Sequence, residues 1–397
     1  MRTVINVSAI IDGTGAEPTP PAHVVIEGDR IVAVDPGTAS SAARDARVLT
    51  YERSTLVPGL IDCHVHLAGL HGGAWNSGES PEPVAHDTVS VVTGLVGVLR
   101  SGITTVRDCG YPHHGIYAVR RAQEEGRVCG PRLLLSGRAL RASGGHGQSI
   151  SVTADGADEF RRAARRELSA GADWIKLMVT GGTASPGEQV SDVQVTPEEA
   201  AAAVGAAHPR GRQVSAHCSN LAGTHLALDA GVDSVEHGIE LDDDVVRKML
   251  ARQAWLVPSL LCTRVEAESG PHPGIPEYVR RKAAEIYRLQ EDSFRRALAA
   301  GVRIAAATDS GPSYLPPGGR ALAGELETMT RLGMDPVAAI AAATGRAAEM
   351  LRIDGDVGTI APGRIADLVV LPQDPRDDVR VIERPVAVFQ AGREVGP

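Results

Sequence analysis

The sequence predicts an α/β fold: a (β/α)8 TIM barrel with a small β-sandwich domain formed from both chain termini. Three observations predict it. The middle of the chain alternates apolar, strand-like runs with Ala/Arg/Glu-rich stretches of helical period, whereas both ends are rich in short strand and turn patterns. Histidine, lysine and aspartate also follow several central runs, as expected where a barrel gathers its strand ends onto one rim. A doubly wound open sheet is the structural alternative.

The chain begins and ends with β-rich segments. Residues 2–10 are mainly apolar, and strand-like runs at Ala22–Glu27 and Arg30–Val34 flank Gly28-Asp29, a two-residue hairpin turn. The closing runs are 366–371, 385–390 and 393–395. We therefore expect the two ends to pair into one domain.

Eight runs in the centre are strand candidates, which is the number that a (β/α)8 barrel needs. They are 56–62, 103–108, 132–136, 173–179, 213–217, 233–237, 255–260 and 303–308. Stretches of helical period between them include 156–170, 197–208, 242–252, 276–300 and 321–332. We expect residues 1–55 and 360–397 to form the sandwich and residues 56–359 to form the barrel.

Composition narrows the class of protein. A chain of 397 residues, 43% of them hydrophobic, can hold one large barrel and a smaller domain. The net charge of −9 argues against a nucleic-acid or anionic-membrane partner. We expect no signal peptide and no membrane span, because no apolar run approaches 18 residues. The five cysteines form no CxxC pair, which favours reduced thiols in a cytoplasmic protein.

The sharpest motif is the apolar strand 56–62 that leads into His64 and His66. Side chains two apart on a strand point to the same face, so both imidazoles can reach one ion at the barrel mouth. Val214–His217 and Ser234–His237 each end an apolar run with one histidine, which indicates a second metal. The alternative at each position is an ordinary strand-end histidine.

Lys176 lies between Ile175 and Leu177 in a chain with three lysines against 37 arginines. Burying a lysine disfavours its charged form, and a neutral amine can add CO2 to give a carbamate with one oxygen for each of two metals. The alternative is a strand lysine that reaches solvent or pairs with Asp309.

Asp309 ends the eighth run, where it could ligate a metal and accept a proton from water. The alternative is a helix N-cap, which the Pro/Gly-rich sequence after it disfavours. In Gly144-Gly145-His146-Gly147, His146 could hydrogen-bond a substrate carbonyl or the tetrahedral oxyanion; the alternative is a surface loop. Glu236 could support a ligand, whereas a solvated loop residue is the favoured interpretation of Arg107.

With these residues in place, the chain resembles the amidohydrolase superfamily along nearly its whole length. The motif Val57-Pro58-Gly59-Leu60-Ile61-Asp62-x-His64-x-His66 precedes Lys176, His217, His237 and Asp309 in that superfamily's order. The segments 342–348 and 358–368 resemble its closing signature. The Gly-Gly-His146-Gly loop and the Gly181-Gly182 turn look most like the Xaa-Pro dipeptidase and imidazolonepropionase-like members.

The resemblance implies a binuclear centre of two divalent metals, zinc being the first choice. His64, His66 and Asp309 would hold one metal, His217 and His237 the other, and Lys176, as N6-carboxylysine, would bridge them. His146 would help to position the substrate, and relatives of this type are commonly homo-oligomers.

We therefore expect a metal-dependent hydrolase that cleaves an amide C–N bond in a dipeptide-like or N-acyl amino acid small molecule. The alternatives are hydrolysis of a cyclic amide, urea, carbamate, lactone or ester on the same centre, a deaminase or lyase reaction, and a non-catalytic scaffold on the same fold. The expected specificity loops have no readable code; they are 67–90, which contains Trp75, and 138–152, 180–195 and 261–275.

Overall fold

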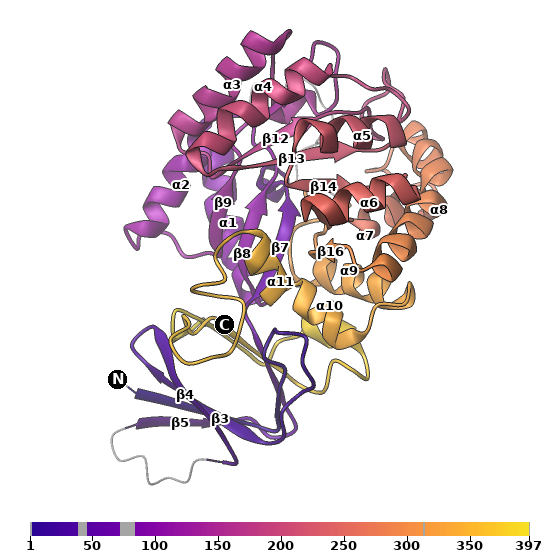
Figure 1. The fold of residues 1–397 in the computed structure, drawn as a ribbon. Coiled ribbons are helices and arrows are strands. Elements are labelled where there is room, and N and C mark those ends of the chain that lie inside the picture. The colour runs from indigo at the N-terminus through magenta and orange to yellow at the C-terminus, as the bar shows by residue number, and fades with distance from the viewer. Residues whose placement is uncertain (1, 39–45, 72–83, 313, 397) are drawn as a thin grey trace. The chain divides into compact units, whose positions relative to one another are not determined.

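The computed structural model describes residues 2–38, 46–71, 84–312 and 314–396 (Figure 1). Trp75, which belongs to an expected specificity loop, lies outside these residues. The chain divides into two compact units, which are described separately. Unit 1 comprises Met1–Asp62, Leu95–Thr105 and Gly318–Pro397, and unit 2 comprises Cys63–Gly94 and Val106–Pro317.

Unit 1 contains two sheets built from both ends of the chain. The first has the order β4-β3-β1-β5, with β1 at Arg2–Val7, β3 at Ala22–Glu27, β4 at Arg30–Pro36 and β5 at Ala46–Thr50. The second has the order β19-β18-β17-β6-β2, with β2 at Ala9–Ile10, β6 at Thr55–Pro58, β17 at Leu368–Leu371, β18 at Ala387–Gln390 and β19 at Arg393–Glu394. The predicted Gly28-Asp29 turn joins the antiparallel strands β3 and β4, and Gly28 has the positive φ of 64° that this turn favours.

One hydrophobic cluster of unit 1 draws on both sheets. Ile5 and Val24 contribute from the first sheet, and Leu56, Val370 and Phe389 from the second. The helices of this unit are α9 at Gly319–Arg331, α10 at Pro336–Ala342 and α11 at Gly345–Met350. The two ends of the chain are therefore held together by shared core burial as well as by strand pairing.

The strands that run into unit 2 form a parallel array. A seven-stranded sheet has the order β11-β10-β12-β13-β14-β15-β16, and a three-stranded sheet has the order β7-β8-β9. Their bounds are β7 at Leu60–Val65, β8 at Ile103–Asp108, β9 at Arg132–Leu135, β10 at Ala139–Arg141, β11 at Ser151–Thr153, β12 at Trp174–Met178, β13 at Gln213–Cys218, β14 at Ser234–His237, β15 at Trp255–Val257 and β16 at Arg303–Ile304. Strands β12 to β16 pair in parallel, each with the next along the chain.

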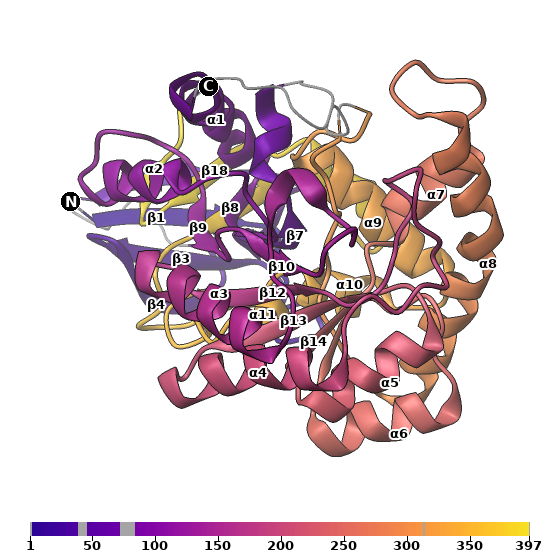
Figure 2. The same ribbon diagram turned by 90° about the horizontal axis from the view of Figure 1, so that it is seen from above.

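Helices alternate with these strands, as the periodicity predicted. Their bounds are α1 at Val84–Arg100, α2 at Gly115–Glu124, α3 at Ala157–Ala170, α4 at Pro197–Ala207, α5 at Leu221–Ala230, α6 at Asp243–Arg252, α7 at Leu260–Glu268 and α8 at Glu277–Ala300. In both views α4, α5 and α6 lie along one side of strands β12 to β14 (Figures 1 and 2). None of the described helices is long and apolar enough to cross a membrane.

Two of the expected strands are shorter in the structure. The run expected at 255–260 is a strand only at Trp255–Val257, because Ser259 adopts a left-handed φ of 49° and α7 begins at Leu260. The run expected at 303–308 pairs regularly only at Arg303–Ile304. The residues after β16 instead bond to β7: Cys63 donates to the Ala306 carbonyl over 3.1 Å and Asp309 to the His64 carbonyl over 2.8 Å.

Candidate metal centre

Strand β7 and the segment after β16 bring three of the predicted ligands together. The Nε2 atoms of His64 and His66 each lie 3.3 Å from Oδ1 of Asp309. The ligand atoms of these three residues all lie within 4.8 Å of one another. Both histidines are buried. Asp309 starts no helix, since α9 begins ten residues later at Gly319, so the N-cap alternative does not hold.

Hydrogen bonds at the back of both imidazoles fix which nitrogen faces Asp309. Nδ1 of His64 donates to Oε2 of Glu236 over 2.8 Å, and Nδ1 of His66 donates to the Gly110 carbonyl over 3.3 Å. A neutral imidazole that donates from Nδ1 carries a lone pair on Nε2. Two nitrogen lone pairs and a carboxylate oxygen therefore converge on one point. These three groups repel one another unless a cation lies between them, so the arrangement fits a divalent metal ion.

Burial and neighbouring charges shift the pKa values of four of the predicted site residues. Burial, together with nearby Lys176, lowers the pKa of His64 to about 3. Burial also lowers the pKa of His237 to about 4, and that of His217 well below its ordinary value. Although burial alone would raise it, the histidines hold the pKa of Asp309 far below its ordinary value. At neutral pH these shifts favour neutral His64, His217 and His237 and an ionised Asp309, which are the forms that bind metal.

The other two predicted histidines lie beside this group, at the ends of β13 and β14. The ring centroids of His217 and His237 are 4.5 Å apart, and those of His237 and His64 are 5.3 Å apart. Nε2 of His217 lies 3.3 Å from the Gly181 carbonyl and 3.0 Å from the Ser219 hydroxyl. The carbonyl can only accept, so a proton on Nε2 satisfies this contact and leaves Nδ1 as the lone-pair nitrogen. Two histidines supply only part of a ligand set, so a second metal here needs a further ligand.

Lys176 lies among these groups on β12. Its side chain is 1% exposed, and Nζ has no hydrogen-bond partner among the residues that the structure describes. Neither the solvent-reaching alternative nor the pairing with Asp309 is therefore observed. A buried ammonium that makes no hydrogen bond is costly, because its N–H donors lose the bonds that they make to water. A metal-bridging carbamate at this position would remove that cost and complete the ligand set around His217 and His237.

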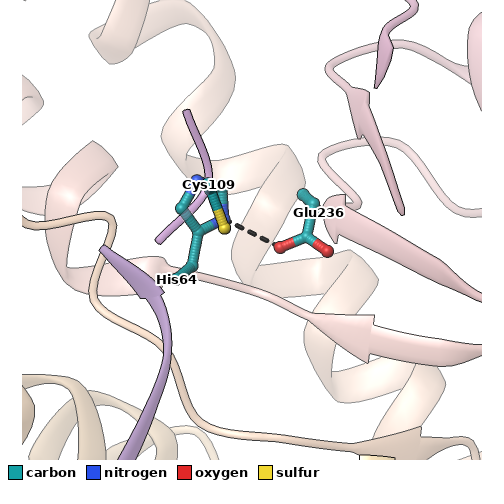
Figure 3. A group of neighbouring side chains, drawn as sticks. All are labelled: His64, Cys109 and Glu236. Atoms are coloured by element: carbon teal, nitrogen blue, oxygen red, sulfur yellow. Dashed lines mark hydrogen bonds and ion pairs between the residues drawn. The ribbon is translucent and has the colours of Figure 1, made fainter. Parts of the chain in front are cut away.

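His64, Cys109 and Glu236 form a second group of potential metal ligands, but hydrogen bonds already occupy its carboxylate (Figure 3). Nη2 of Arg107 donates to both oxygens of Glu236, over 2.7 and 2.8 Å, and His64 donates to one of them from its rear nitrogen. Ser234 donates to the other oxygen over 2.8 Å. The Glu236 carboxylate is thus engaged by Arg107, Ser234 and His64, and its bond to His64 is the contact that the suggested support role requires.

Arg107 was expected as a solvated loop residue, and this expectation is wrong. The side chain is buried on β8, with its guanidinium 4.4 Å from the centre of the Trp174 ring. Burial alone would lower its pKa, but Glu236 raises it, so the pair is ionised. Sequence reasoning missed the role because the partner of Arg107 lies 129 positions away along the chain.

His146 lies beside the predicted ligands, with its ring stacked on His217 at a centroid distance of 4.4 Å. Nδ1 donates to Oε1 of Glu188 over 2.6 Å. A Cβ on Gly182 would come within 2.5 Å of the His146 ring, so glycine at this position makes room for the imidazole. The backbone of His146 lies in a loop, as the alternative expected, but the side chain is only 12% exposed and lies beside the predicted ligands.

The loop that carries Glu188 is held by a buried lysine of α8. Nζ of Lys282 donates to the Ser185 carbonyl over 2.6 Å and also to the Glu188 carbonyl. Tyr278, one turn earlier on α8, donates to the Ala184 carbonyl over 3.0 Å. These contacts join α8 to the loop and through Glu188 to His146, a connection that no local sequence pattern indicates.

All the predicted site residues line one cavity of about 330 Å³ in unit 2. They are His64, His66, His146, Lys176, His217, His237 and Asp309. The wall of the cavity also includes Glu266 and Tyr314, which sequence reasoning did not single out. A cavity of this size suits a small molecule.

Two of the predicted ligands adopt backbone conformations that are uncommon outside glycine. His237 has a φ of 66° and Asp309 a φ of 52°. The left-handed conformation at His237 turns its side chain out of the strand alternation, so that both Glu236 and His237 reach the site. Such residues are concentrated at functional sites, where the surrounding structure holds them in place.

Known proteins resemble this chain along most of its length. A model described as the amidohydrolase family matches residues 55–395. An ochratoxinase from Aspergillus niger is 30% identical over 97% of this chain and 84% of its own length. An imidazolonepropionase from Rhizorhabdus wittichii is 27% identical over 86% of this chain and 85% of its own. A crystal structure of a Xaa-Pro dipeptidase with bound methionine in the active site is 30% identical, with a TM-score of 0.88 and 99% of each chain covered.

Proposed function

We propose that this chain, which belongs to the amidohydrolase family, is an enzyme that hydrolyses the amide C–N bond of a dipeptide-like or N-acyl amino acid small molecule. One observation carries the proposal: the lone-pair nitrogens of His64 and His66 converge with Asp309 beside the unpartnered Lys176 in a cavity of small-molecule size. The likeness to an ochratoxinase and to a Xaa-Pro dipeptidase supports an amide as the bond that is cleaved.

We further propose that the parallel strands close into a (β/α)8 barrel over residues 56–359, and that residues 1–55 and 360–397 form a β-sandwich domain. The bonds from Cys63 to Ala306 and from Asp309 to His64 support closure at one edge. The bond from Asp173 to the Leu135 carbonyl, over 2.8 Å, supports continuity between β9 and β12. The cluster shared by the two sheets supports the sandwich.

In this proposal two divalent ions, with zinc as the first choice, are held by the predicted residues. His64, His66 and Asp309 would hold one ion and His217 and His237 the other, with Lys176 as the bridge. To form the bridge, the neutral Nζ amine attacks CO2, an N–C bond forms and a proton passes to solvent. Bound metals would supply an acidified water and a Lewis acid for the carbonyl.

The chain's own residues then move the protons. Asp309 accepts a proton from the attacking water at its carboxylate and returns it to the departing nitrogen. Glu188 holds Nδ1 of His146, so the imidazolium form of His146 can donate from Nε2 to the carbonyl oxygen as negative charge develops there. Although burial alone would raise it, the hydrogen bond from His146 holds the pKa of Glu188 below its ordinary value.

Metal content and hydrolysis test the proposal together. Protein purified without chelator is analysed by plasma mass spectrometry beside a panel of dipeptides and N-acyl amino acids. About two equivalents of metal with a hydrolysed panel member would support the binuclear amidase. One equivalent would make Lys176 structural, and no metal, with no rescue by added Zn or Mn, would contradict the chemistry.

The same panel separates the alternatives. Activity on cyclic amides, ureas or lactones without activity on linear dipeptides would favour the ring or ester reaction, and release of ammonia would favour deamination. We also propose a homo-oligomer, which light scattering on the metal-loaded protein would test.

A further inference from the structure

The cavity wall contains a buried carboxyl group, that of Glu266, which has no role in the chemistry proposed above. Glu266 lies on α7, lines the cavity and is only 5% exposed. Tyr314 donates to its Oε1 over 2.6 Å, and Thr183 donates to its Oε2 over 3.0 Å. Donors from two separate segments therefore fix the orientation of one carboxyl group at the cavity surface.

The surroundings of Glu266 make its negative charge costly. Burial, aided by the negative charge of Asp309 and opposed by the hydrogen bonds from Tyr314 and Thr183, raises the pKa of the Glu266 carboxyl to about 7. A cation placed against the carboxyl would reverse this effect, because an opposite charge at contact distance favours the ionised form. The binding energy of such a cation would therefore include relief of the desolvation cost.

The remaining wall suits the rest of such a ligand. Ile239, Val279 and Ile286 line the same cavity and are almost fully buried. Apolar walls beside a single carboxylate match an aliphatic stem that ends in a cationic group. Among the described residues of the cavity wall, the basic side chains are Lys176 and the histidines, all of which lie in the proposed catalytic cluster.

We propose that Glu266, held by Tyr314 and Thr183, is a specificity subsite for a cationic group, an ammonium or guanidinium on an aliphatic stem, in the substrate. This inference rests on the proposed amide hydrolysis, since it names the class of substrate for that reaction. It selects lysyl- or arginyl-type substrates from the panel.

Lysine and norleucine differ by the terminal ammonium and have nearly the same stem, so they provide the test. The metal-loaded full chain is assayed on Ala-Lys against Ala-norleucine and on Lys-Ala against norleucine-Ala. We expect kcat/KM to favour lysine by about ten- to a hundredfold in one of the pairs, the range of a hydrogen bond to a charged group. Glu266→Gln should bring that ratio close to one.

Glu268→Gln is the matched control, because it removes the same charge from an exposed position two residues along α7. Its ratio should equal that of the unchanged chain. If Glu266→Gln does not fold, Glu266→Asp keeps the charge but shortens the side chain, and we expect an intermediate ratio. A ratio near one in both pairs, or a high ratio that survives Glu266→Gln, would overturn the subsite and leave amide hydrolysis standing.

Binding of free amino acids separates the two proposals if no peptide is hydrolysed. Calorimetry compares L-lysine with L-norleucine on the metal-loaded chain and on Glu266→Gln. Tighter binding of lysine that depends on Glu266 would support the subsite while counting against the proposed reaction. Equal binding, or none by either amino acid, would overturn the subsite.

Discussion

Glu236→Gln should destabilise the protein strongly without changing the size of any side chain. The carboxylate accepts four hydrogen bonds, two from Arg107 and one each from Ser234 and His64. A glutamine amide keeps one oxygen that accepts hydrogen bonds and replaces the other with an NH2 group. This NH2 donor then faces the donors of the neighbouring side chains. Arg107 is left buried without an opposite charge, so we expect a loss of about 3–5 kcal/mol in the free energy of unfolding.

The same substitution should weaken the metal centre. Glu236 fixes the tautomer of His64, and losing a partner of this kind typically lowers metal affinity by about ten- to a hundredfold. Urea unfolding of the metal-free chain, followed by circular dichroism, measures the first effect, and competition with a metal indicator measures the second.

Glu268→Gln again serves as the control for loss of a carboxylate, and a double variant isolates the pair. Arg107→Met combined with Glu236→Gln should lower the free energy of unfolding by less than the sum of the single changes. The reason is that the double variant leaves no buried charge without its opposite charge. A Glu236→Gln protein within about 1 kcal/mol of the unchanged chain would refute the reasoning.

Three further predictions concern other parts of the site. Gly182→Ala should displace the His146 ring and lower kcat/KM by about a hundredfold with metal content unchanged, whereas Gly187→Ala, where a Cβ meets nothing within 4 Å, should have no effect on either. The intact protein should carry a 44-unit adduct that Lys176→Ala lacks, and that variant should lose metal; full activity and full metal content in it would contradict the carbamate. Glu266 has a folded pKa of about 7 against an ordinary 4.5, so its stabilising contribution is complete below pH 4.5 and is lost as the pH rises through 7. Urea unfolding should therefore show Glu266→Gln gaining about 2.5 kcal/mol on the unchanged chain between pH 5 and pH 8, and parallel pH profiles would argue against this assignment.

Local patterns predicted the elements that position the centre. The His-x-His strand and the strand-end histidines follow from apolar runs that end in polar residues, and Lys176 follows from its place between two apolar residues of one run. Strand alternation is likewise a local property. The hairpin at Gly28-Asp29 follows from turn chemistry in the same way. Amphipathic helices such as α3 and α8 began within one residue of the expected positions, because their period extends over many residues.

Contacts between distant segments could not be predicted in this way. Arg107 looks like any strand-end arginine until Glu236 is placed beside it, and Glu266 looks like one more helical glutamate until the cavity is known. The left-handed backbone at Ser259 shortened the predicted strand β15, because a single residue's conformation depends on the packing around it. Sequence therefore located the predicted ligands better than the groups that contact them, such as Glu236, or the proposed specificity residue Glu266.

The left-handed backbone at His237 and Asp309 has a consequence for protein engineering. A design procedure that ranks substitutions by backbone compatibility would favour glycine at both positions, since glycine adopts a positive φ without steric cost. Each change would recover on the order of 1 kcal/mol while erasing a ligand. Libraries built to make this enzyme more heat-resistant should therefore hold both positions constant and take their gains from sites remote from the cavity.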